Sequence, residues 1–168
     1  MAVFWKRGEG QNADKPSAGP SSPSPLQRPR IGLALGGGVA RGWGHIGVLK
    51  ALHNLGLRPD VVAGTSVGAL VGAAYLVSRL DVLEEWARGL NKLRIVRLLD
   101  LKMRSGGLVG GKKLVDAMYE HFGDIRIEDL PVPFVAVATD LLTGHEIWLR
   151  HGPLVDAVRA SFSIPGIF

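Results

Sequence analysis

In Asp60-Val61-Val62-Ala63-Gly64-Thr65-Ser66-Val67-Gly68-Ala69-Leu70, a short apolar run meets a stretch of small and apolar residues. The run predicts a buried strand over 60–63, and the residues after it predict a helix over 66–80. Between them stands the pattern G-x-S-x-G, which at a strand-to-helix turn holds a serine on a sharp bend with its hydroxyl exposed. Taken alone, the segment fits two interpretations: a nucleophile at Ser66, or an ordinary glycine-rich turn.

The same arrangement occurs once earlier in the chain. An apolar strand is predicted over 31–35, the turn Gly36-Gly37-Gly38-Val39-Ala40-Arg41-Gly42 follows at once, and a helix is predicted over 39–55. A strand, a glycine turn and a helix in repetition predict a parallel sheet with helical crossovers. The expected class is therefore α/β, with functional sites at the carboxyl ends of the strands.

The remaining elements follow from apolar runs and from glycine and proline punctuation. Helices are predicted over 81–90, with Asp81 as N-cap, over 112–121 after Gly110-Gly111, and over 153–160. The continuous apolar run 133–138 predicts a central strand, and Gly144 is expected to turn the chain into a further strand over 146–149.

Composition limits the classes of function. Hydrophobic residues make up 46% and charged residues 21% of the 168 residues, as in globular proteins. The sequence has no cysteine, so disulfides and cysteine-based metal sites are excluded. The formal net charge of +5 suits an anionic partner, although a solvated basic surface is the more common reason for such a charge. The basic amphipathic segment 88–104 could lie on an anionic membrane, or it could be a solvated helix face.

Two further segments bear on location. Residues 1–29 are rich in proline, serine and glycine and are expected to form a disordered leader. Its apolar patch comes before the basic pair Lys6-Arg7, the reverse of a secretory signal, so a cytoplasmic protein is expected. Residues 61–78 carry no formal charge, but their glycines favour a buried strand and helix over a membrane span.

Three chemistries could use the amide groups of the first glycine turn. A dinucleotide fingerprint would need glycine at the sixth position from Gly36, where Arg41 stands. A phosphate-binding P-loop is approached by Gly106–Lys113, but Lys113 replaces the hydroxyl that binds magnesium. The third is an oxyanion hole, in which N–H groups near Gly37 face Ser66 from a neighbouring strand.

Four blocks of the sequence, in order, resemble the patatin-like phospholipase family in its bacterial form. They are Gly36–Leu49, Gly64–Leu70, Ala138–Gly144 and Ala160–Phe168. The resemblance runs from about Arg30 to the last residue. It divides the chain into the leader 1–29 and a patatin-like domain over 30–168.

The resemblance implies a three-layer α/β/α sandwich and an enzyme that hydrolyses lipid esters with a Ser–Asp dyad. The implied partner is a lipid ester or phospholipid, and neither a cofactor nor a nucleic-acid partner is expected. No cluster of ligating side chains has metal-ligand spacing, so no metal is expected either. Peripheral contact with an anionic membrane is an interpretation that the basic segment 88–104 leaves open. Ser66 corresponds to the nucleophile. The oxyanion hole corresponds to the backbone of Gly36, Gly37, Gly38 and Val39, and the supporting residues to Arg41, Gly64 and Gly68.

The sequence departs from the family at the base. The family's aspartate lies in an Asp-Gly-Gly or Asp-Gly-Ala motif beyond the block that ends here at Phe168, and no aspartate of this sequence is followed by glycine. A serine without a base is a poor nucleophile. The domain is therefore expected to be incomplete, cut short within its fold, and the 168-residue chain to be inactive or nearly so.

Two other interpretations stay open. Asp140 with His145 or His151 would match the serine, acid, histidine order of a general α/β-hydrolase, although these histidines follow the acid closely in the sequence. Alternatively, the chain is a non-catalytic regulatory or acyl-binding protein that keeps its glycine turns for folding. Reactivity of Ser66 toward a fluorophosphonate distinguishes an enzyme from such a protein.

Overall fold

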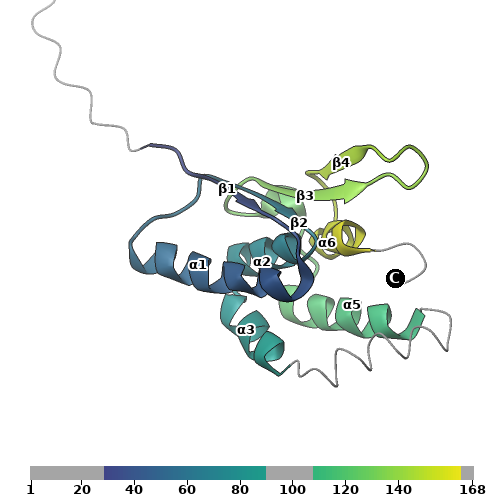
Figure 1. Ribbon diagram of the computed structural model, residues 1–168, viewed down its shortest axis with the longest axis horizontal. Helices are drawn as coiled ribbons and strands as arrows, with labels where there is room; N and C mark the ends of the chain where they lie inside the picture. Colours follow the sequence, from purple (N-terminus) through teal and green to yellow (C-terminus); the bar gives the residue numbers. More distant parts are fainter. Residues whose placement is uncertain (1–28, 90–107, 164–168) are drawn as a thin grey trace, which may run out of the picture.

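The computed structural model describes residues 29–89 and 108–163, without the side chains of Val39 and residues 108–114 (Figure 1). The elements in chain order are β1 (Gly32–Leu35), the 3₁₀ helix η1 (Val39–Trp43), α1 (Gly44–Asn54), β2 (Val61–Thr65), α2 (Val67–Leu76), α3 (Leu80–Arg88), α5 (Leu108–Phe122), the 3₁₀ helix η2 (Ile127–Asp129), β3 (Phe134–Thr139), β4 (Glu146–Leu149) and α6 (Leu154–Phe162).

The strands form one sheet in the order β1-β2-β3-β4. β1, β2 and β3 are parallel, and β4 returns antiparallel to β3 as a hairpin. Leu35 of β1 pairs with Gly64 of β2, so these strands end at nearly the same level. The α/β class with a mainly parallel sheet is confirmed, as is the central place of β3. The two glycine turns therefore meet at one edge of the sheet.

The sheet is buried on the side where α1, α2 and α6 lie (Figure 1). Val62 of β2 points to this side and is fully buried, whereas its neighbour Val61 is 42% exposed. This alternation is expected of a strand covered on one face. The described α-helices lie on this side of the sheet, with α3 packed on α2 and α5 on α6 (Figure 1). The helical layer on the other face of the predicted sandwich stays a prediction.

α2 is the central helix of the core. All its residues from Gly68 to Ala74 are buried, together with Leu76. Its small residues bring it close to the sheet: a Cβ added at Gly72 would lie 3.2 Å from the side chains of Phe134 and Val62. The uncharged stretch 61–78 is therefore a core strand and helix. Over the described ranges, no helix is long and apolar enough to cross a membrane.

Several predicted boundaries are wrong. The helix predicted over 39–55 begins as η1, becomes α-helical only at Gly44 and ends at Asn54. Gly42 of η1 packs closely on α2: a Cβ added at Gly42 would lie 2.8 Å from Cγ1 of Val67. The helix predicted from 66 begins at Val67 and ends at Leu76 rather than at 80. Ser66 is the residue before the helix.

Two further helix starts differ from prediction. α3 begins at Leu80, and the Asp81 carboxylate makes no capping bond but an ion pair with Lys50 at 2.5 Å. Gly110-Gly111 lies within α5, which begins at Leu108, because the continuing helix overrides the low propensity of glycine. The predicted leader, the basic segment from residue 90 to 104, and residues 164–168 lie outside the described residues.

Candidate active site

Ser66 stands at the junction of β2 and α2 with φ 56° and ψ −122°. In the described chain only one other non-glycine residue, Ser78, has a positive φ. Such a backbone costs on the order of 1–3 kcal/mol and persists only where neighbouring contacts fix it. The α2 amide groups begin at this point, so the positive end of the helix dipole is directed at the serine.

The two glycines around Ser66 are required by packing. A Cβ on Gly64 would lie 2.5 Å from Cα of Ala69, and a Cβ on Gly68 would lie 2.0 Å from the carbonyl oxygen of Leu35. Both distances are shorter than any real contact, and both involve backbone atoms. Gly68 thus lets α2 begin directly against the end of β1, which brings the first glycine turn to the serine.

Gly37 lies next to Ser66. A Cβ added at Gly37 would contact Cβ of Ser66 at 3.4 Å and the carbonyl oxygen of Thr65 at 3.7 Å. Gly38 has φ 128° and its carbonyl accepts a hydrogen bond from the amide of Arg41 at 3.0 Å. Among the described hydrogen bonds, none uses the amide N–H of Gly37 or Gly38. Both glycines are exposed, and Gly37 is the one that lies beside the serine.

His45 fixes the start of this turn. Its Nε2 lies 2.9 Å from the carbonyl oxygen of Gly36, and because a carbonyl only accepts, the histidine donates. A trans peptide carries its C=O and N–H on opposite sides. The bond therefore turns the N–H of Gly37 away from His45.

Ser161 fixes the serine turn from the other side. Its Oγ accepts a hydrogen bond from the amide of Ser66 at 2.8 Å and donates one to the carbonyl of Val137 at 2.6 Å. The hydroxyl thereby joins α6 and β3 to the strained residue, 95 positions away in sequence. It also occupies the N–H of Ser66, which is consequently not a free oxyanion donor.

Asp140 closes the β3–β4 turn. Its Oδ1 accepts hydrogen bonds from the amides of Thr143 at 2.8 Å and Leu142 at 2.9 Å. The amide of Thr143, and then that of Leu142, holds the pKa of Asp140 below its usual range. The amide of Asp140 also binds the carbonyl of His145 across the hairpin. These bonds give the Asp140 carboxylate a local role in the turn.

Among the described hydrogen bonds, none joins the Ser66 hydroxyl to a side chain that could act as its base. No side chain of His145 or His151 bonds Asp140, so the described hydrogen bonds contain no serine–histidine–acid chain. In the same part of the chain, no group of three or more histidines, aspartates and glutamates could hold a metal ion.

The predicted site residues fall into two groups. Gly36, Gly37, Gly64, Gly68 and Ser66 come together at one edge of the sheet. Gly38 and Val39 continue the turn that begins at Gly36. Arg41 forms the second group: its side chain makes no described hydrogen bond or ion pair, so its supporting role stays a prediction.

Sequence reasoning did not predict the hydrogen bonds of two positioning residues. Ser161 stands in the last of the four family-like blocks and His45 in the first, but their hydrogen bonds depend on tertiary proximity. The presence of both residues within those blocks was the one available signal.

Comparison with known proteins gives several similarities. A family model described as patatin-like phospholipase matches residues 33–168. An uncharacterized NTE family protein of Mycobacterium bovis is 46% identical over 139 residues, which covers 83% of this chain and 39% of the relative, and one of Mycobacterium tuberculosis gives the same values. The neuropathy target esterase sws of Drosophila melanogaster is 37% identical over 141 residues, 81% of this chain and 10% of that protein. The chain spans about two fifths of the length of the mycobacterial relatives.

Proposed function

The chain belongs to the patatin-like phospholipase family, and from this premise we propose that it carries the nucleophile and oxyanion hole of a serine lipid acyl hydrolase. The observation that carries the proposal is the strained Ser66, placed at the end of β2 against the glycine turn that follows β1. Neither a cofactor nor a metal takes part in the proposed reaction.

In the proposed reaction, Ser66 Oγ attacks the acyl carbonyl of a lipid ester, and a base takes the hydroxyl proton. The tetrahedral oxyanion accepts hydrogen bonds from the amides of the Gly36–Val39 turn, with Gly37 nearest to the serine. When the tetrahedral intermediate collapses, the alcohol leaves with the proton that the base returns to it, and an acyl-enzyme remains. Water then hydrolyses the acyl-enzyme through a second tetrahedral intermediate and frees Ser66.

The positive end of α2 supports the same charge. The helix begins at Val67, so its unpaired amides lie beside the carbon that Ser66 attacks. Removing one donor from such a hole typically lowers the rate by about 100- to 1,000-fold. His45 and Ser161 hold the two turns in register, and thus act as positioning residues.

The proposed base is an aspartate of the family's Asp-Gly motif, which the 168 residues do not contain. The serine of this chain alone is therefore a weak nucleophile. We propose that ester hydrolysis requires this motif to be joined to the chain, and that the 168 residues by themselves turn over little substrate.

A chimaera tests the proposal. Residues 30–168 replace the matching segment of the Mycobacterium tuberculosis relative, and the chimaera, the relative and the purified 168-residue chain are assayed with p-nitrophenyl butyrate. The chimaera is expected to hydrolyse the ester at a rate near that of the relative, and the chain alone at a small fraction of it.

Ser66→Ala in the chimaera supplies the control. The substitution is expected to abolish both hydrolysis and labelling by a fluorophosphonate probe, while thermal unfolding stays unchanged. A folded chimaera that is inactive beside an active relative contradicts the enzyme proposal and favours a non-catalytic acyl-binding protein. Full turnover by the 168-residue chain contradicts the missing base.

We further propose that the substrate is a membrane lipid reached from the cytoplasmic side by peripheral contact. The formal charge of +5 supports attraction to anionic lipid. Co-sedimentation with vesicles of phosphatidylglycerol is expected to exceed that with phosphatidylcholine and to fall with added salt; equal binding to both contradicts the proposal.

A further inference from the structure

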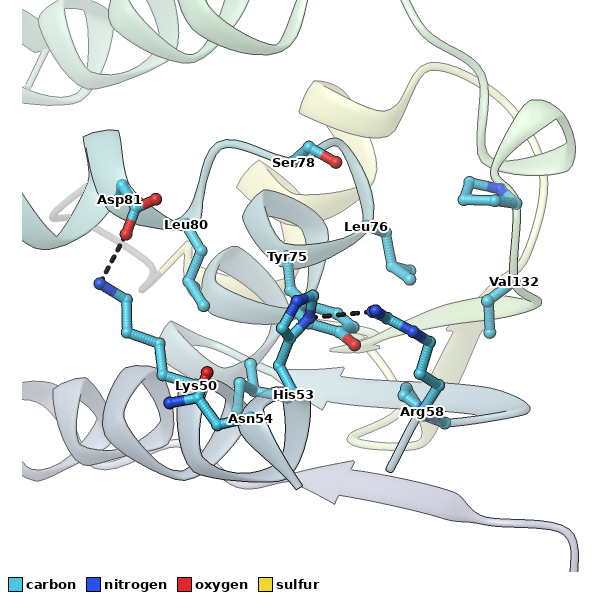
Figure 2. A pocket seen from close by; sticks show the side chains of 13 residues that line it. Lys50, His53, Asn54, Arg58, Tyr75, Leu76, Ser78, Leu80, Asp81 and Val132 are labelled. Atoms are coloured by element: carbon cyan, nitrogen blue, oxygen red, sulfur yellow. Dashed lines mark hydrogen bonds and ion pairs between the residues drawn. The ribbon is translucent and has the colours of Figure 1, made fainter. Parts of the chain in front are cut away.

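A cavity of about 610 Å³ lies at the end of the sheet opposite to Ser66 (Figure 2). Pro59 before β2 and Val132 before β3 line it, so it opens at the amino ends of these strands. Tyr75 and Leu76, near the end of α2, line it as well. α2 has ten residues, so the cavity and the serine are separated by about 15 Å of buried helix.

Hydrogen-bond donors gather on one side of this cavity. His53 at the end of α1 and Arg58 before β2 point toward each other in Figure 2, with Nδ1 of His53 2.9 Å from Nη1 of Arg58. A guanidinium only donates, so Nδ1 accepts and the other ring nitrogen, Nε2, carries a proton. The pair therefore offers the remaining guanidinium N–H groups and one ring N–H. The Asn54 amide and the Tyr75 hydroxyl also line the cavity and make no side-chain hydrogen bond to another described residue.

The charges of the lining leave one cation unmatched. Lys50 is bound by the carboxylates of both Asp81 and Glu84. Arg58 makes no ion pair with any described carboxylate, and its one described contact is with His53. Arg58 and His53 are both exposed, and among the described lining residues Arg58 is the cation that a negatively charged ligand could pair with.

The cavity also has an apolar part to its lining. It consists of Leu49, Leu76, Leu80, Pro59, Pro131 and Val132. A ligand with a short hydrocarbon body and one anionic end matches both parts. The volume lies within the range of 300–1,000 Å³ that is usual for small-molecule sites.

We propose that this cavity binds a medium-chain carboxylate, with the carboxylate on the Arg58–His53 pair and the hydrocarbon against the Leu49, Leu76 and Val132 wall. The planar guanidinium offers paired N–H groups that match a carboxylate. One unmatched cation suits a monoanion better than a phosphate dianion. The site is separate from the serine and does not depend on the proposed hydrolysis.

Isothermal titration of the purified protein with sodium octanoate, below its micelle concentration, tests the proposal. Saturable binding with one site is expected, and Ser66→Ala is expected to bind equally well. Arg58→Gln is expected to weaken binding about tenfold or more, as the loss of a charged hydrogen bond does. Arg126→Gln is the matched control, because Arg126 is an exposed arginine paired with Glu128 and does not line the cavity; it is expected to keep the wild-type affinity.

Two further ligands test the chemistry. 1-Octanol, which lacks the charge, is expected to bind at least tenfold more weakly than octanoate, and octyl phosphate is expected to bind no more tightly. Absence of saturable octanoate binding overturns the proposal. So does equal affinity of wild type and Arg58→Gln, or of octanoate and octanol. Tighter binding of octyl phosphate overturns the assignment to a carboxylate.

Discussion

At the scale of single residues, Ser66 shows how a strained backbone is held. Its amide donates a hydrogen bond to Ser161, and Gly37 lies against its Cβ. Gly64 and Gly68, on either side of it, are so close to other backbone atoms that neither position has room for a side chain. These contacts offset a strain of about 1–3 kcal/mol. The serine is thus held at the helix start by residues of β2, α2, α6 and the turn after β1.

Ser161→Ala is expected to slow the reaction of Ser66 with a fluorophosphonate in the chimaera. The substitution leaves the amide of Ser66 and the carbonyl of Val137 without their partner. An unsatisfied group costs about 1–3 kcal/mol when it is fully buried, and less for part-buried groups such as these two. Ser163→Ala is the matched control, because the Ser163 hydroxyl bonds the carbonyl of Arg159 within α6 alone. Rescue of the rate by Ser161→Thr is expected, since threonine keeps the hydroxyl. Equal labelling rates in Ser161→Ala and wild type exclude a positioning role.

Gly68→Ala is expected to destabilise the protein by about 1–3 kcal/mol or more, because the new methyl group would overlap the backbone of Leu35. Gly47→Ala in α1 is the control: no heavy atom lies within 4 Å of its added Cβ. There, alanine is expected to stabilise the helix by about 0.5–1 kcal/mol. Thermal unfolding of the two variants measures both effects. A Gly68→Ala protein as stable as wild type means that α2 does not need its close contact with β1.

At the scale of elements, α2 links the serine turn to the cavity at the far end of the sheet. It contacts all three parallel strands and α6, and it has no polar face. A helix that is apolar on all sides belongs in a core. Its small residues set the distance to the sheet, as at Gly72 beside Phe134. Both ends of α2 consequently hold fixed positions relative to the strands.

η2 is tied to the segment before α6 by one carboxylate. The Glu128 carboxylate accepts a hydrogen bond from the amide of Gly152 at 2.9 Å and forms an ion pair with Arg126 at 2.8 Å. Its own backbone amide, and then that of Gly152, lowers the pKa of Glu128 to about 2. The pKa of Glu128 in the folded protein is thus below the ordinary glutamate value of 4.5, so ionised Glu128 stabilises the fold above about pH 4.5 and this contribution is lost as the pH falls toward 2.

The effect of Glu128→Gln on stability is therefore expected to depend on pH. The free energy of unfolding, measured by urea denaturation, is expected to differ most between wild type and variant above pH 4.5, and the difference is expected to shrink as the pH falls to 2. Arg126→Gln is expected to keep most of this pH dependence, because the amide bonds contribute more than the ion pair to the pKa shift. If the difference in unfolding free energy between wild type and Glu128→Gln does not change with pH, the lowered pKa of Glu128 does not stabilise the fold.

At the scale of the whole molecule, one core joins the sheet to the helices on its covered face. Leu154 and Val158 of α6 are fully buried and share this core with Leu49 of α1 and Val71 of α2. The other face of the sheet leaves Val61 and Trp148 42% and 52% exposed. The stability of the described fold consequently depends on the covered face.

Leu154→Ala is expected to lower the free energy of unfolding by about 2–5 kcal/mol, because a fully buried leucine leaves a cavity between α6 and its neighbours. Leu142→Ala is the control, because Leu142 in the β3–β4 turn is 96% exposed and buries almost nothing. Urea denaturation of both variants is the measurement. A change of less than 1 kcal/mol for Leu154→Ala contradicts the burial of α6.

Much of this architecture could be predicted from the sequence. Apolar runs located the four strands, and the two glycine turns predicted that the first two strands belong to a parallel sheet, whereas the strand order came from the structure alone. The predicted helix ends were less accurate. Asp81 was predicted to be an N-cap, but its carboxylate pairs with Lys50. A helix was predicted to begin after Gly110-Gly111, but α5 begins before these glycines and contains them. Local propensity has little weight where a partner in space offers a stronger interaction.

By itself, the sequence determined the α/β class, the family resemblance and the position of Ser66 on a glycine turn, because strands, turns and small residues are local signals with a fixed period. Only the tertiary structure decided which distant groups hold that turn. The hydrogen bonds of Ser161 and His45, and the cavity between α1, α2 and the amino ends of β2 and β3, join residues far apart in the chain. Such contacts follow from the packing of whole elements, which no local pattern encodes.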